Sequence, residues 1–215
     1  ADLVRNGAEN TEVALEIKSR RYQKPQTLKI TRKTIIYPSV VSKQLDNQIG
    51  YTKILSFGTE TPQRLLGELG SLKNNKSLII DLRDNPGGLL NSVNQILGYF
   101  VGFQKTIIIE KGRTTQVEIQ TSYFQRSYPP NVVVLINNFS ASASEIMAGN
   151  MKHYKVATLI GVRTFGKALV QESFDLDASK HDPDKTQLLV KVTTQRYLLP
   201  NGQDISSSGV EPDIE

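Results

Sequence analysis

The sequence predicts an α/β protein built on a mixed, largely parallel sheet with flanking helices, preceded by a short β-rich segment. Strand-like and helix-like stretches alternate through the middle of the chain, which is typical of βαβ units. Residues 78–80 and 132–136 are continuous aliphatic runs, as expected of parallel strands that are buried on both faces. The 215 residues, 38% of them hydrophobic, suffice for one large domain or for a medium domain and a small one.

The first predicted element is an antiparallel hairpin. Residues 11–18 and 27–36 alternate polar and apolar side chains, and a turn region with Pro25 separates them. Such a hairpin has one apolar face, and because a lone hairpin is marginal in water, it must pack on something else. The pattern changes at residues 37–39, where we expect a boundary.

Two strands and two helices follow in alternation. Thr61 is a candidate N-cap, Pro62 suits the first position of a helix, and the leucines behind it recur at helical spacing. A buried strand then ends in a turn with paired glycines, and an amphipathic helix comes next. The predicted segments are a strand at 49–58, a helix at 59–72, a strand within 77–88 and a helix at 89–101.

The second half of the chain is richer in predicted strands. It contains one clear strand–helix–strand unit, which argues for parallel pairing of the two strands. The predicted segments are a hairpin at 105–113 and 115–122, a strand at 131–138, a helix at 144–154, strands at 156–162, 168–174 and 187–199, and a turn at 200–202.

The composition excludes several kinds of site. Without cysteine the chain has no disulfide, no thiolate nucleophile and no zinc–sulfur centre. Its two histidines, His153 and His181, offer little for a metal cage, so we predict no metal and no other cofactor. The sequence contains no run of about 18 apolar residues, so it predicts no membrane-spanning helix.

The charge pattern does not indicate nucleic-acid binding. The net charge of +5 is modest, and the basic residues cluster mainly in 18–33. A nucleic-acid surface would have such a cluster, but so would the solvated face of a hairpin. Few aromatic side chains accompany it, which favours the hairpin face, and we expect no nucleic-acid partner.

Three serines, Ser140, Ser142 and Ser144, alternate with alanines directly after the predicted strand at 131–138. Ser142 and Glu145 fit a capping box, and the motif by itself favours that structural interpretation. The context points to chemistry, because a turn between a parallel strand and a helix lies where open α/β sheets bind ligands. A serine there can attack a carbonyl while the N–H of the next residue stabilises the oxyanion.

A serine nucleophile needs a base. His153 lies about three turns along the same predicted helix and is too far from Ser142, while His181 lies in a polar loop. Lys167 is another candidate, because a lysine readily loses its charge when it is buried. In a strand, Lys167 and Gln171 share a face, which would let Gln171 accept a hydrogen bond from the amine. An ordinary surface position remains the alternative for Lys167, and Asp and Glu remain alternative bases.

The glycine pair Gly87-Gly88 follows a predicted buried strand. Paired glycines let the backbone approach a ligand and direct an N–H group at it, although the sequence NPGG is also ordinary turn chemistry. The neighbouring Asp81, Arg83 and Asp84 fit either a structural ion pair at the end of the sheet or residues that shape the site, and we favour the structural interpretation.

Together, the stretches LIIDLRDNPGGLL, NNFSASASEIMAGNM, GVRTFGKALVQ and TTQRYLLPNGQDISSSGVEPDI resemble the carboxyl-terminal processing proteases, also called tail-specific proteases. The likeness extends over roughly residues 49–215. It implies a ClpP/crotonase-like core and a serine endopeptidase that cleaves protein substrates near their C-termini with a Ser-Lys dyad and no cofactor. The chain departs from the family at Ala168, where a glycine is common.

The resemblance also assigns roles to individual residues. The middle serine of the family's motif is its nucleophile, which here is Ser142, and Lys167 follows 25 residues later as the base. Gln171 matches the residue that orients the lysine. The oxyanion hole is matched by residue Ala143 and by one amide of the pair Gly87 and Gly88, without deciding between the two glycines.

The resemblance divides the chain into two parts. Residues 1–36 resemble only the C-terminal part of a PDZ domain, and residues 37–215 resemble the peptidase core. Because Ala1 is not a methionine and begins no signal-peptide pattern, we expect an upstream part to be absent from this chain. Two alternatives remain: a non-catalytic ligand- or peptide-binding protein on the same fold, and an inactive fragment that lacks its complete PDZ domain.

The expected partners are protein or peptide substrates with accessible C-termini. Peripheral membrane association and oligomer formation stay open. The resemblance implies a place in the cell envelope, either the bacterial periplasm or the extracellular face, with the thylakoid lumen as the alternative.

Overall fold

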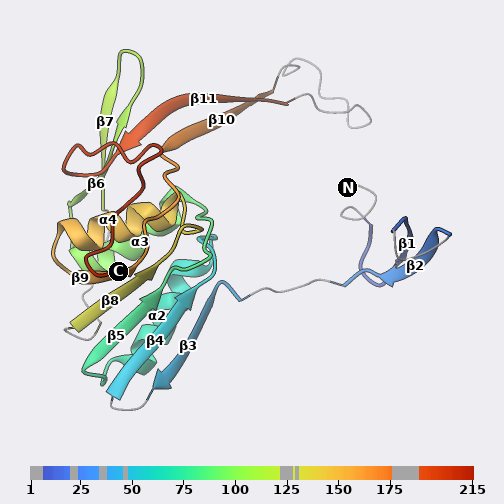
Figure 1. Ribbon diagram of the computed structural model, residues 1–215, viewed down its shortest axis with the longest axis horizontal. Helices are drawn as coiled ribbons and strands as arrows, with labels where there is room; N and C mark the ends of the chain where they lie inside the picture. The colour runs from blue at the N-terminus through green and yellow to red at the C-terminus, as the bar shows by residue number, and fades with distance from the viewer. Residues whose placement is uncertain are drawn as a thin grey trace. The chain divides into compact units, whose positions relative to one another are not determined.

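The computed structural model describes residues 7–19, 24–33, 38–45, 48–121, 128, 131–175 and 189–215 (Figure 1). His181 lies outside these residues, as do Arg20 and Arg21 of the basic cluster. The chain divides into two compact units, Ala1–Pro38 and Ser39–Glu215. Among the helices of the described ranges, none is both long and apolar enough to cross a bilayer.

The first unit contains the predicted hairpin. Strand β1 (Glu12–Ile17) pairs antiparallel with β2 (Gln26–Thr31). Val13 lies opposite Ile30, so these apolar side chains share one face, as the alternation predicts. Strand β2 is shorter than the predicted strand at 27–36. The structure does not describe residues 34–36 of that range.

The second unit is built on a five-stranded sheet in the order β3-β4-β5-β8-β9. Strands β4, β5, β8 and β9 run parallel, and β3 pairs antiparallel with β4 at one edge. The predicted mixed and largely parallel sheet is thereby confirmed. The strands are β3 (Val40–Leu45), β4 (Ile49–Ile54), β5 (Ser77–Asp81), β8 (Asn131–Ile136) and β9 (Ala157–Gly161).

Three helices connect these strands: α2 (Thr61–Leu72), α3 (Leu90–Val101) and α4 (Ala143–His153). All three were expected from the sequence within one or two residues at each end. The predicted N-cap is wrong, because Glu60 precedes the helix and Thr61 is its first residue. The Thr61 hydroxyl instead accepts the Gly58 N–H at 2.9 Å and donates to the Ser56 carbonyl at 3.1 Å, so it fixes the loop before the helix.

A second, antiparallel sheet has the order β10-β11-β6-β7. Its strands are β6 (Thr106–Lys111), β7 (Gln116–Gln120), β10 (Leu169–Asp175) and β11 (Leu189–Leu198). Helix α4 contacts β9 of the first sheet and β6 of the second, and thus lies between them (Figure 1). Its Met147 and Met151 are fully buried in this position. The N-terminus of α4 is therefore held rigidly at the carboxyl end of β8.

Candidate active site

Ser142 immediately precedes α4, in the turn that follows β8. Its backbone has φ 57° and ψ −115°, a conformation that a residue with a side chain rarely adopts. Such strain persists only where the surroundings enforce it, and it is concentrated at functional sites. The turn lies at the carboxyl end of a parallel strand, as the sequence predicts, and the Ser142 side chain is half-buried.

The two flanking serines are fully buried, and each hydroxyl is used in a hydrogen bond to a main-chain carbonyl. The Ser140 hydroxyl donates to the Leu82 carbonyl at 2.8 Å, and the Ser144 hydroxyl donates to the Asn85 carbonyl at 2.9 Å. Both bonds tie the serine turn to the turn that follows β5. Their geometry is that of packing residues, which leaves Ser142 as the serine with a chemical role to assign.

Glu145 links the Ser142 turn to the segment that carries Lys167. The predicted capping box is present, and in it Glu145 Oε2 accepts the Ser142 N–H at 2.8 Å. The same oxygen accepts the main-chain N–H of Lys167 at 2.9 Å. Oε1 accepts the Gly166 N–H and the Thr164 hydroxyl, each at 2.6 Å. Glu145 has no exposed surface, so these donors and the α4 N-terminus replace water around its carboxylate.

Lys167 precedes β10, which begins at Leu169, and its side chain is exposed. Its amine makes no hydrogen bond or ion pair within the described ranges. The alternation that predicts a shared face with Gln171 does not extend to Lys167, because the strand starts later and its register against β11 shifts between Val170 and Gln171. Gln171 is likewise exposed. The structure therefore brings the Lys167 backbone to the serine turn, while the Lys167 side chain is exposed.

The glycine pair lies against the Ser142 turn. A side-chain carbon on Gly87 would lie 2.8 Å from Ser142 Cβ and 2.9 Å from the Ala143 nitrogen, and φ at Gly87 is 101°. Only glycine allows both this approach and this conformation. The Ala143 N–H makes no main-chain hydrogen bond among the described residues, as expected for the first residue of a helix.

The two glycine amides differ in their partners. The Gly87 N–H donates to Asn85 Oδ1 at 2.9 Å, and that bond is buried. Gly88 bridges to Phe57 through the Gly87 carbonyl and the Leu89 N–H, so its own N–H faces away from Phe57. In the part of the chain that the structure describes, the Gly88 N–H has no hydrogen-bond acceptor. This distinction depends on the side chain of Asn85, which sequence reasoning missed.

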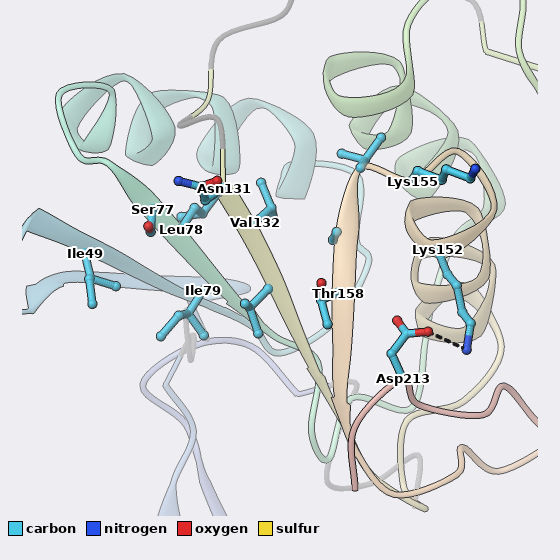
Figure 2. Close-up of a pocket in the computed structure, with 13 residues that line it drawn as sticks. Ile49, Ser77, Leu78, Ile79, Asn131, Val132, Lys152, Lys155, Thr158 and Asp213 are labelled. Atoms are coloured by element: carbon cyan, nitrogen blue, oxygen red, sulfur yellow. Dashed lines mark ion pairs between the residues drawn. The ribbon is translucent and has the colours of Figure 1, made fainter.

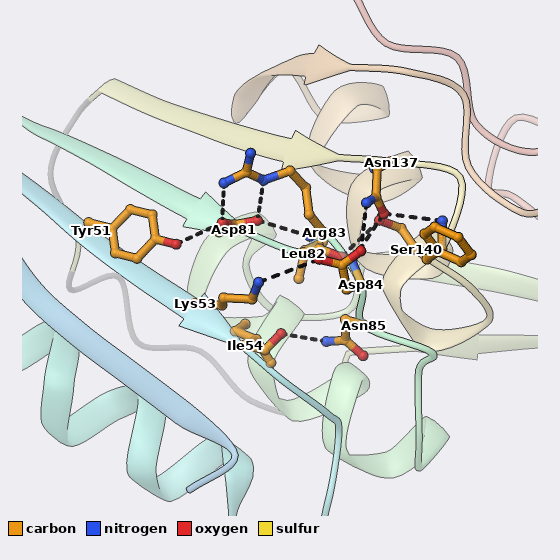
Figure 3. A network of polar contacts seen from close by, with 11 residues as sticks. Tyr51, Lys53, Ile54, Asp81, Leu82, Arg83, Asp84, Asn85, Asn137 and Ser140 are labelled. Carbon is orange, nitrogen blue, oxygen red and sulfur yellow. Dashed lines mark hydrogen bonds and ion pairs between the residues drawn. The ribbon is translucent and has the colours of Figure 1, made fainter. Parts of the chain in front are cut away.

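The polar residues after β5 form a structural network (Figure 3). Arg83 binds the buried Asp81 carboxylate through two side-chain bonds of 2.9 and 2.7 Å, and the Tyr51 hydroxyl donates to it at 2.7 Å. Burial by itself raises the pKa of Asp81, but hydrogen bonds from Arg83 and Tyr51 outweigh it, and the pKa is lowered. The interpretation of Asp81 and Arg83 as a structural ion pair is confirmed.

Asn137 connects the two turns of the site. Its side-chain amide donates to Asp84 Oδ1 at 2.8 Å, and its oxygen accepts the Asp84 N–H at 3.0 Å. Lys53 pairs with the same Asp84 at 3.8 Å (Figure 3). Because these contacts join β4, β5 and β8, the glycine turn and the serine turn are fixed relative to each other.

A hollow at the other end of the parallel sheet is separate from this site (Figure 2). It lies at the first residues of β4, β5 and β8, which are Ile49, Ser77 and Asn131, whereas Ser142 follows the carboxyl end of β8. The Lys152 amine on its wall already pairs with Asp213 at 2.9 Å. None of the candidate catalytic residues lines it.

Comparison with known proteins relates the second unit to one family. A model of peptidase family S41 matches residues 48–215. A probable CtpA-like serine protease of Staphylococcus aureus (strain bovine RF122 / ET3-1) is 33% identical over 213 residues, which cover 97% of this chain and 40% of that protein. Another, from Staphylococcus haemolyticus (strain JCSC1435), is 36% identical over 217 residues, with coverage of 97% and 41%.

The fold has a matching solved structure. The photosystem II D1 C-terminal processing protease superposes with a TM-score of 0.71 and 25% identity, over 97% of this chain and 56% of that one. The chain thus spans less than two thirds of the length of each of these relatives.

Proposed function

Because this chain belongs to peptidase family S41, we propose that it forms the catalytic core of a serine endopeptidase that cleaves protein substrates near their C-termini. The observation that carries the proposal is the strained Ser142 backbone beside two main-chain amides, those of Ala143 and Gly88, that lack protein acceptors in the described structure. Such an arrangement supports the assignment of a nucleophile next to an oxyanion hole.

In the proposed reaction, the Ser142 oxygen attacks the scissile carbonyl carbon while Lys167, as a neutral amine, takes the hydroxyl proton. The new C–O bond gives a tetrahedral intermediate whose oxyanion accepts hydrogen bonds from Ala143 and Gly88. The intermediate collapses, the C–N bond breaks, and Lys167 returns the proton to the leaving amine. Water then hydrolyses the acyl-enzyme by the same steps.

Gly88, rather than Gly87, is the proposed second donor. The Gly87 amide is held by Asn85 Oδ1 in a buried bond of 2.9 Å, and giving it up would leave that oxygen without a partner. The Gly88 amide needs no such exchange. Asn85 therefore orients the turn, and Gly88 binds the oxyanion.

Lys167 is supported as the base by the position of its backbone. Its N–H and that of Ser142 bind the same oxygen of Glu145, so the length of a lysine side chain spans the distance to the serine. Rotation of the exposed side chain towards Ser142 completes the dyad, and we propose that Gln171 of β10 holds the amine there. A substrate that covers the site would remove water from the amine and favour its neutral form.

Ser142→Ala and Lys167→Ala test the dyad through cleavage of a peptide with a free C-terminus. Each variant is expected to lose nearly all turnover and to keep the circular dichroism spectrum of the wild type. Cleavage at the wild-type rate by Lys167→Ala would remove Lys167 from the mechanism.

A second candidate is favoured by the exposed Lys167 side chain, whose amine makes no hydrogen bond or ion pair among the described residues. In this alternative, the chain has the catalytic residues but is inactive by itself, because a further part of a longer protein must place the amine. We propose that residues 1–36 are the C-terminal part of a PDZ domain that would supply such a part. Peptide cleavage by this chain, compared with that by a version extended at its N-terminus, separates the two: equal rates contradict the alternative.

The proposed substrate class and location are inferred from similarity to known proteins. The name of one solved relative states C-terminal processing, which supports protein substrates with accessible C-termini for this chain. We propose the cell envelope as its location, with the thylakoid lumen as the alternative. Periplasmic or surface fractionation of the source cells, with an antibody against this chain, tests that proposal.

A further inference from the structure

Tyr197 of β11 holds the segment that carries Lys167. Its side chain is 3% exposed, and its hydroxyl donates a hydrogen bond to the Lys167 carbonyl. Its main-chain N–H donates to the Ala168 carbonyl at 3.0 Å. The Lys167 N–H in turn donates to Glu145. Buried side chains therefore bind both main-chain polar groups of Lys167, its N–H and its carbonyl.

The same phenol lies near the nucleophile. The side chains of Glu145 and Ser142 both influence the pKa of Tyr197. Tyr197 therefore hydrogen-bonds the main chain of one proposed dyad member and lies close to the side chain of the other.

The phenol stays protonated in this environment. Burial raises the pKa of Tyr197, and the nearby charge of Glu145 raises it further, while the nearby Ser142 side chain lowers it only in part. The hydroxyl is thus a permanent donor to Lys167 at any pH at which a peptidase would work.

We propose that Tyr197 is a positioning residue of the peptidase site, which fixes the direction in which the Lys167 side chain leaves the backbone. This rests on the proposed Ser-Lys mechanism. A buried tyrosine usually finds a hydrogen-bond partner for structural reasons alone, and the distinguishing feature here is that this partner is the main chain of the proposed base, whose N–H is held by Glu145.

Tyr197→Phe tests the proposal, because it keeps the buried ring and removes only the hydroxyl. The matched control is Tyr154→Phe, whose hydroxyl also donates to a main-chain carbonyl, that of Thr106 at 2.7 Å, at the far end of α4. We expect Tyr197→Phe to lower kcat at least tenfold with KM within twofold of the wild type, and Tyr154→Phe to keep both. A kcat within threefold of the wild type in folded Tyr197→Phe would overturn the positioning role.

Hydrogen exchange of the Lys167 amide gives a readout that needs no activity. In Tyr197→Phe this amide, which binds Glu145, is expected to exchange at least tenfold faster than in the wild type, while Tyr154→Phe leaves it unchanged. Unchanged exchange in Tyr197→Phe would contradict the proposal even if the chain cleaves no peptide. If neither the wild type nor an N-terminally extended version cleaves peptide while exchange is accelerated in Tyr197→Phe, the proposed function is refuted and the structural assignment is kept.

Discussion

The buried carboxylate of Glu145 accepts the main-chain N–H of Lys167, with 2.9 Å between the nitrogen and Oε2. The same oxygen accepts the N–H of Ser142, so one side chain positions the backbones of both proposed catalytic residues. The two segments are separated in the chain by α4 and β9. Glu145 is therefore the contact through which the fold assembles the proposed dyad.

Glu145→Gln should damage the site more than it damages the fold. The four donors around the carboxylate would meet one oxygen and one NH₂ group, so at least one donor would lose its acceptor, at a cost of about 1–3 kcal/mol. We expect a lower melting temperature and at least a tenfold lower kcat. Glu118→Gln, on the exposed strand β7, is the control and should change neither quantity. Wild-type kcat in folded Glu145→Gln would show that this tie does not matter for catalysis.

The three serines should separate by function. Ser140→Ala and Ser144→Ala each remove one buried hydrogen bond between the two turns, which should cost about 1 kcal/mol of unfolding free energy and keep kcat within a few-fold. Ser142→Ala should abolish cleavage, and because it also removes the capping hydrogen bond to the start of α4, it should cost about 1 kcal/mol of unfolding free energy. Urea unfolding and peptide cleavage, measured on the same samples, check these expectations. If Ser140→Ala abolished cleavage and Ser142→Ala retained it, the assignment of Ser142 as the nucleophile would be wrong.

Gly87→Ala should lose both stability and activity. The added carbon would lie 2.7 Å from the Ala141 carbonyl oxygen, and φ of 101° strains any residue with a side chain. Gly67→Ala is the matched control, because nothing lies within 4 Å of the added carbon and alanine favours a helix by about 0.5–1 kcal/mol. Thermal unfolding should show a lower melting temperature for Gly87→Ala and a slightly higher one for Gly67→Ala. Equal melting temperatures in the two variants would contradict the close approach of Gly87 to the serine turn.

Asp81 should make the protein sensitive to acid. Its folded-state pKa lies below the ordinary value of 3.8, so near that pH the unfolded chain binds more protons than the folded chain. The stability that Asp81 contributes is present above about pH 4 and is lost as the pH falls through its folded-state pKa. Urea unfolding between pH 7 and pH 2 should show this loss, and Asp81→Asn should be less stable at pH 7 with a shallower decline in acid. An unchanged pH dependence in Asp81→Asn would exclude Asp81 as its source.

Local sequence patterns predicted most of the elements of the fold. The aliphatic runs in β5 and β8 and the leucine spacing of α2 are signals contained within a few residues, and the structure confirms them. Strand β3 was missed because only Val40 in it is buried, so no clear alternation marks it. The separation of β6, β7, β10 and β11 into a second sheet depends on long-range pairing that no local pattern records.

In the candidate site, too, the features set by local sequence were predicted and those set by long-range contacts were not. The strand–turn–helix pattern placed Ser142 at the carboxyl end of a parallel strand, and Glu145 was predicted as half of a capping box. Its bond to Lys167, 22 residues away, and the bond from Tyr197 to Lys167, 30 residues away, were not predicted. Polar side chains that meet only in the folded state carry no periodic signal, and Asn85 has none either.

Labelling with a serine-directed fluorophosphonate, with the modified residue identified by mass spectrometry, tests whether Ser142 is the nucleophile and Lys167 its base. The Ser-Lys account predicts one adduct, on Ser142, which is absent in Ser142→Ala and at least tenfold slower to form in Lys167→Ala. Failure of the folded wild type, together with an N-terminally extended version, to react at Ser142 would contradict it and favour a non-catalytic binding protein on the same fold. Equal labelling rates in the wild type and in Lys167→Ala would contradict the assignment of Lys167 as the base.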